Sequence, residues 1–97
     1  MLNFISTQER RIYRAEVRLI GMLLRSPRSL SRLATRIQPC NFSDYRHQLI
    51  WSAMLRLNER GDQVSIESVL AELIRQALDE DAGGLSYLNY LARKSHR

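Results

Sequence analysis

Arginine is the residue type with the clearest capacity for chemistry in this sequence, supplying fourteen of the fifteen basic residues. A guanidinium group binds carboxylates and phosphates through two parallel hydrogen bonds, and residues three or four apart share one face of a helix. The candidate binding residues form two stripes in neighbouring predicted helices: Arg11, Arg14 and Arg18, with Arg25 on the same side, and Arg28, Arg32 and Arg36. The stripes predict contact with phosphates or with an acidic protein surface. The alternative is two solvated helix faces.

Other reactive side chains are few. His47 and His96 are the only histidines, and a lone helical histidine is expected at the edge of the core or partly exposed. Cys40 is expected to be a small buried hydrophobic residue. Asp79-Glu80-Asp81 lacks the spacing of a calcium loop and predicts a solvated turn. Neither G-x-G-x-x-G nor a G-x-x-x-x-G-K-(S/T) loop occurs, so no phosphate-binding loop is evident. Since a single cysteine also excludes a C-x-x-C zinc site, we expect no enzyme activity, no cofactor and no metal.

Charge and length restrict the class of protein. Residues 1–60 carry eleven arginines and four acids (+7), residues 61–92 one arginine and six acids (−5), and the last five residues add +3. The 97 residues suit a single domain over 1–97. A single cysteine excludes an internal disulfide, and neither a secretory signal nor a membrane-spanning run is visible. A cytoplasmic protein is therefore expected.

The hydrophobic pattern is helical almost throughout, and no segment alternates as a strand would. A first helix follows the capping box Ser6-Thr7-Gln8-Glu9 and runs to about Arg25. Four more are expected over about 27–38, from Ser43 or Asp44 to Gly61, over 66–78 behind a Ser65 cap, and over 85–94 after Gly83-Gly84. The predicted fold class is all-α, a compact bundle of about five helices.

Several large side chains fall on the predicted apolar faces. Besides Trp51, which is expected in the core, these faces include Ile12, Tyr45, Ile74 and Leu85. Exposed aromatic or long apolar residues would anchor a partner better than arginine, since such residues dominate binding energy. Met22 and Tyr90 are the candidates for that role if they lie on the surface.

A helix-turn-helix is an alternative interpretation of the last two predicted helices. In it, Ser86, Asn89, Arg93 and Lys94 would face bases and phosphates. The connecting segment is longer than the usual tight turn, and its acids would be repelled by a duplex. A small basic nucleic-acid-binding protein of this type remains the alternative function.

An ordered set of residues along the chain is typical of one family. The set is Ala15-Glu16-x-x-Leu19-Ile20-Gly21-x-Leu23-Leu24, Phe42, His47-x-x-Ile50-Trp51-x-x-Met54-x-x-Leu57, Gly61, Val64-Ser65, Gly83-Gly84 and Tyr87-Leu88-x-x-Leu91. In order and spacing it resembles the N-terminal domain of DnaB-type replicative helicases over about residues 14–92. A short flexible N-terminus and a basic C-terminal tail would flank this head.

The resemblance implies a binding module rather than a catalyst. In the family this helical head dimerises and contacts the primase and, in some systems, the helicase loader. The implied partners are therefore a replicative helicase, a primase or a loader, with a homodimer as a further option and nucleic acid as a secondary one. The helical hairpin and the ATPase domain that follow the head in the family are not among these 97 residues, so we expect a free-standing head or a fragment.

Overall fold

The computed structural model describes residues 6–95, and within that range the chain is helical with no strand. The elements in order are α1 (Thr7–Arg25), η1 (Pro27–Ser29), α2 (Leu30–Ala34), η2 (Pro39–Asn41), α3 (Tyr45–Arg60), α4 (Ile66–Arg75) and α5 (Gly84–Lys94), where η denotes a short 3₁₀ helix. The predicted all-α class with five α-helices is confirmed. No helix in the described range is long and apolar enough to cross a membrane.

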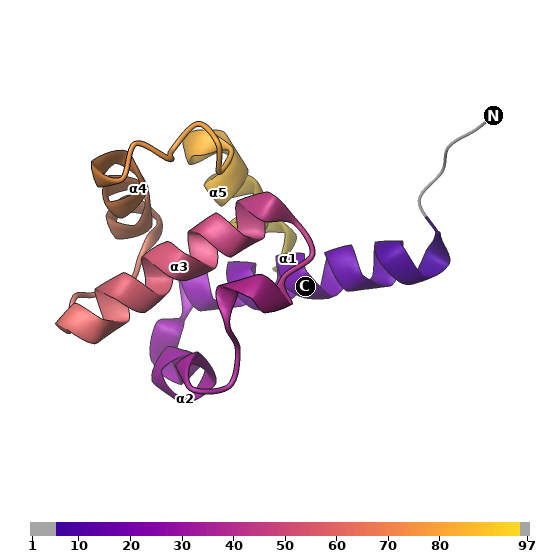
Figure 1. Ribbon diagram of the computed structural model, residues 1–97, viewed down its shortest axis with the longest axis horizontal. Coiled ribbons are helices and arrows are strands. Elements are labelled where there is room, and N and C mark those ends of the chain that lie inside the picture. Colours follow the sequence, from indigo (N-terminus) through magenta and orange to yellow (C-terminus); the bar gives the residue numbers. More distant parts are fainter. Residues whose placement is uncertain (1–5, 96–97) are drawn as a thin grey trace.

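Helix α1 begins at the predicted capping box. The Ser6 hydroxyl accepts a hydrogen bond from the Glu9 amide, and the Glu9 carboxylate accepts one from the Ser6 amide, both at 3.0 Å. These bonds satisfy amides that have no partner within the helix. The N-terminal half of α1 extends away from the other helices, as Figure 1 shows, and gives the molecule its longest dimension of 47 Å. The predicted flexible segment before Ser6 lies outside the described residues, as do the last two residues of the predicted basic tail.

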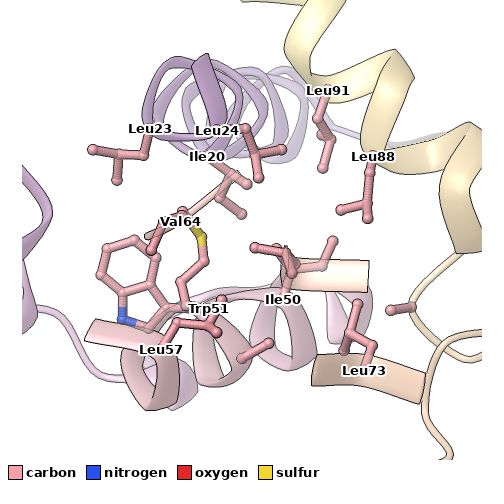
Figure 2. Close-up of a cluster of buried hydrophobic side chains, with 14 of the residues drawn as sticks. Ile20, Leu23, Leu24, Ile50, Trp51, Leu57, Val64, Leu73, Leu88 and Leu91 are labelled. Atoms are coloured by element: carbon pink, nitrogen blue, oxygen red, sulfur yellow. The ribbon is translucent and has the colours of Figure 1, made fainter. Parts of the chain in front are cut away.

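The core lies where α1, α3, α4 and α5 meet. Figure 2 shows side chains from all four helices converging there: Ile20, Leu23 and Leu24 from α1, Ile50, Trp51 and Leu57 from α3, Leu73 from α4, and Leu88 and Leu91 from α5. Trp51 has no exposed surface, which confirms its predicted place in the core. Its indole N–H donates to the Ile37 carbonyl at 2.9 Å, so the buried donor is satisfied.

The second predicted helix is shorter than expected. In place of a helix over about 27–38, the chain forms η1 and then the five-residue α2. After Ala34 the amides of Arg36 and Ile37 both donate to the Leu33 carbonyl at 2.9 Å, in a turn that closes the helix. The arginines at positions 28, 32 and 36 therefore do not lie on one continuous helix.

Helix α4 also ends early, at Arg75 rather than near residue 78. Ala77 has the left-handed backbone conformation, with φ of 60°. The Ala77 amide donates to the Ile74 carbonyl and the Leu78 amide to the Leu73 carbonyl, which is the hydrogen-bond pattern of a Schellman motif. Glycine usually holds this position, and because alanine stands there, no residue in the sequence indicates that α4 ends at Arg75.

Four residues placed on apolar faces and one cysteine are exposed instead of buried. Ile12, Tyr45, Ile74 and Leu85 have exposed fractions between 40% and 58%. Each lies in a terminal turn or in the projecting half of α1. The helical period still assigns such a residue to the apolar side of its helix, but the neighbouring helices do not bury it there. Cys40, expected to be buried, is exposed in η2, on the short connection between α2 and α3.

Candidate functional site

The six candidate arginines are all exposed, but the structure divides them into two sets. Three project from α1 and three come from η1, α2 and the turn after α2. None of the six guanidinium groups forms a hydrogen bond or ion pair within residues 6–95. Their charge is therefore open to solvent and to a partner. The residues of the first set are Arg11, Arg14 and Arg18, and those of the second are Arg28, Arg32 and Arg36.

A groove of ≈ 650 Å³, called the α1–α5 groove, runs along α1 past Arg14 and Arg18, whereas Arg11 does not line it. It lies between the projecting half of α1, the loop residues Ser43 and Asp44, and the end of α5. Its basic residues are Arg10, Arg14, Arg18 and Lys94, its acidic residues are Glu9 and Asp44, and its apolar and aromatic residues are Ile12, Tyr13, Val17 and Tyr90. Arg14, Arg18 and the predicted anchor Tyr90 thus meet at one surface. The other predicted anchor, Met22, is 40% exposed but does not line the groove.

A buried polar chain crosses from α1 to α3 and α5 and includes Tyr13 of the groove. The imidazole of His47 has no exposed surface. Its Nδ1 lies 2.7 Å from a Glu16 carboxylate oxygen, and its Nε2 lies 2.7 Å from the Tyr87 hydroxyl. The Tyr87 hydroxyl in turn lies 3.2 Å from that of Tyr13. Burial raises the pKa of Tyr87, because a phenolate would lose its hydration there.

The same carboxylate holds the loop before α3. Glu16 accepts hydrogen bonds from the Ser43 amide at 2.7 Å, from the Ser43 hydroxyl at 3.0 Å, and from the Asp44 amide at 3.4 Å. Asp44 is the N-cap of α3, accepting from the Arg46 amide. The Arg46 guanidinium bonds both carboxylate oxygens of Asp44 and thereby lowers the pKa of that carboxyl. Arg46 also lies 3.9 Å above the centre of the Tyr87 ring.

The carboxylate of Glu16, the imidazole of His47 and the phenol of Tyr87 follow one another in the order of a proton relay. The role of this buried polar chain is nevertheless structural. Both nitrogens of the His47 ring are occupied and the ring is fully buried, so a substrate has no access to it. Sequence reasoning placed His47 at the core edge and assigned Glu16 no role. A signal was present: both fall on the apolar faces of their helices, where a buried charge needs a partner.

A second buried carboxylate joins α3 to α4. Glu72 is 1% exposed and contacts Arg56 and Arg60 at 3.0 Å and Arg75 at 3.4 Å. The hydrogen bond from Arg60 is the largest cause of the lowered pKa of Glu72. The three arginines compensate the charge of this acid, and their guanidinium groups are held by it, whereas that of Arg14 has no such partner within residues 6–95.

The helix-turn-helix interpretation gains no support from the geometry. Helices α4 and α5 are joined by the eight residues 76–83 (Figure 1), where the motif needs a turn of three or four. That connection carries the acidic run Asp79-Glu80-Asp81. The four residues assigned to the duplex, Ser86, Asn89, Arg93 and Lys94, are exposed. Lys94 is one of the groove residues and lies over the Tyr90 ring.

Comparison with known families assigns the chain. The family model described as the DnaB-like helicase N-terminal domain matches residues 3–96. The chain belongs to this family. The resemblance seen in the sequence is thereby confirmed over nearly the whole chain.

Individual relatives agree with the family match. The chain is 36% identical over 78 residues to the replicative DNA helicase DnaC of Bacillus subtilis (strain 168), and 37% identical over 78 residues to the replicative DNA helicase DnaB of Geobacillus stearothermophilus. Each alignment covers 80% of this chain but 17% of the relative. The crystal structure of the N-terminal domain of DnaB helicase from Mycobacterium tuberculosis matches with a TM-score of 0.79 and 32% identity, over 84% of this chain and 57% of that one.

Proposed function

We propose that this domain is a non-catalytic protein-interaction module of the DNA replication machinery. Its partner is a replicative helicase, a primase or a helicase loader. The observation that carries the proposal is that the six candidate arginines are exposed and have no partner within residues 6–95, and that three of them stand on α1. Membership of the DnaB-like N-terminal domain family supports the assignment to replication.

The mixture of residues around α1 favours a protein partner over nucleic acid. Interfaces between proteins are enriched in tyrosine and arginine. Tyr13 and Tyr90 lie beside Arg14 and Arg18 in the α1–α5 groove, together with the exposed Ile12. A phosphate backbone gains nothing from the isoleucine, whereas a protein side chain covering it removes apolar surface from water.

Light scattering on a size-exclusion column tests the proposal directly. The protein is run alone and then mixed with the cognate replicative helicase, with the primase, or with the loader. A shift to a heavier complex of defined stoichiometry is the expected result with at least one of them. Separate elution from all three at micromolar concentration would overturn the proposal. An elution shift with duplex DNA at physiological salt, and none with the proteins, would indicate nucleic acid as the partner instead.

Charge reversal on α1 identifies the surface. Replacing Arg14 and Arg18 by glutamate is expected to weaken the complex by about tenfold or more, because each exposed charge contact contributes up to ~1 kcal/mol and reversal turns attraction into repulsion. The melting temperature should change little, since neither guanidinium has a partner within residues 6–95. Unchanged affinity together with an intact melting curve would remove these two arginines from the site.

A further inference from the structure

We infer that the α1–α5 groove binds an acidic amphipathic helix of a partner protein. The apolar stripe of that helix packs on Ile12, Tyr13 and Tyr90, and its acidic residues face Arg14 and Arg18. The inference rests on the proposed interaction function and names the chemistry of the partner. It also separates the six candidate arginines, because only Arg14 and Arg18 of them line the groove.

The floor of the groove supplies the apolar half of the recognition. Ile12 is 40% exposed, although the surrounding sequence places it on the apolar face of α1. The half-buried rings of Tyr13 and Tyr90 lie in the same groove. The groove volume of ≈ 650 Å³ exceeds that of any single side chain, so several anchors of one element can enter together. Anchors spaced by three, four and seven residues are what an amphipathic helix presents to such a groove.

The rim supplies the charged half, because four basic residues line the groove against two acids. Asp44 is paired with Arg46 at 2.8 Å, and the Glu9 carboxylate accepts from the Ser6 amide in the capping box. Arg14 and Arg18 have no such partners within the described range. The groove therefore presents uncompensated positive charge, which attracts an acidic element and repels a basic one.

The spacing of the rim matches a helix. Arg10, Arg14 and Arg18 follow one another at intervals of four residues along α1, which is ~6 Å per interval in an α-helix. Acidic residues four apart on a second helix lying along α1 repeat at the same distance. The two rows then pair in register, while the apolar stripe beside the acids reaches Ile12.

The sequence itself provides a probe that is acidic and amphipathic. A synthetic peptide of residues 66–81 contains five acids and one arginine, for a net charge of −4, and carries a marked helical apolar stripe. Its fluorescently labelled form is titrated with the protein, and polarisation is recorded at physiological salt. One control peptide replaces the five acids by their amides, and a second keeps the composition but scrambles the apolar period. Tight binding of the first peptide and at least tenfold weaker binding of both controls are expected.

Matched variants locate the peptide on the protein. Ile12→Ser and the pair Arg14→Glu with Arg18→Glu should each weaken binding of the acidic peptide by tenfold or more. The pair Arg28→Glu with Arg32→Glu makes the same charge change outside the groove and should weaken it by less than about threefold. Circular-dichroism melting of every variant verifies that the fold is intact.

The outcomes distinguish this inference from the proposed function. Absence of peptide binding, or equal losses from both arginine pairs, overturns the groove inference, while a complex with the helicase, primase or loader would leave the proposed function standing. Peptide binding without any such complex overturns the proposed function alone. Two further results would overturn the inference. An oligonucleotide that binds more tightly than the peptide would indicate nucleic acid in the groove, and self-association of the protein that Ile12→Ser abolishes would indicate a second copy of the protein there.

Discussion

Replacing Gly21 by alanine tests how closely α1 and α5 pack, and therefore what sets the width of the groove. Gly21 is buried on the side of α1 that faces α5. A methyl group there would lie 2.8 Å from the Leu91 carbonyl carbon and 2.7 Å from the Ser95 Cβ, and closer still to the Leu91 carbonyl oxygen. Because the obstacle is largely backbone, it cannot rotate away. The two helices must move apart.

Two opposing effects determine the sign of the change in stability. Alanine in a helix interior is favoured over glycine by about 1 kcal/mol. Overpacking in a close-packed interior typically costs 1–3 kcal/mol, and an obstacle of backbone atoms places this site at about 3 kcal/mol. The expected net result is a loss of about 2 kcal/mol in the free energy of unfolding. For a domain of this size that lowers the melting temperature by roughly 8–16 °C.

Urea unfolding followed by circular dichroism measures the change. Ala15→Gly is the matched control, since Ala15 is exposed on the same helix and reports the propensity effect alone. It should lower the free energy of unfolding by about 1 kcal/mol. If Gly21→Ala instead raised stability by about 1 kcal/mol, only propensity would be at work, and the close approach of α1 to α5 would be refuted.

Three further substitutions test other contacts, each by thermal melting. Tyr87→Phe removes the hydroxyl that bonds His47 and should lower the free energy of unfolding by about 1–3 kcal/mol, because a buried imidazole nitrogen loses its partner. A change below about 0.5 kcal/mol would contradict the hydrogen bonds of the buried polar chain. Ala77→Gly should stabilise by about 1 kcal/mol, since it relieves a left-handed alanine at the end of α4. Arg60 above all lowers the folded-state pKa of Glu72 below its ordinary value of 4.5. The contribution of Glu72 to the free energy of unfolding is therefore present above pH 4.5 and is lost as the pH falls further. Glu72→Gln should make the melting temperature depend less on pH on the acid side, and an unchanged slope would contradict this.

The helices and their order could be predicted because local signals agreed with the hydrophobic period. The box at Ser6 and Glu9, the cap at Ser65 and the left-handed Gly61 all act within one turn, and the structure has each of them. The end of α4 was missed because Ala77 holds a conformation that glycine normally holds. The early end of α2 was missed because the apolar spacing and Pro39 both allow a helix up to residue 38, and no residue marks the turn at Thr35 and Arg36.

The candidate site was predictable in part. The period of α1 was enough to place Arg14 and Arg18 on the exposed side, opposite the core residues. The groove was not predictable, because Tyr90 reaches it from α5 and Asp44 from the loop before α3. A periodic pattern fixes which side of a helix a residue occupies, but not which distant segment lies beside it.

The internal bonds of the acids help to explain why positive charge dominates the surface of the N-terminal half. Of the four acids in residues 1–60, Glu16 is buried against His47, Asp44 is bound to Arg46, Glu9 accepts from the cap of α1, and Glu59 is exposed at the end of α3. The first three carboxylates stabilise the fold, and their charge is engaged before a partner arrives. Arg11, Arg14 and Arg18 have no corresponding acid within the described residues. The buried polar chain already orders the surface that an acidic partner would contact. Ordering the groove therefore costs little of the free energy of binding.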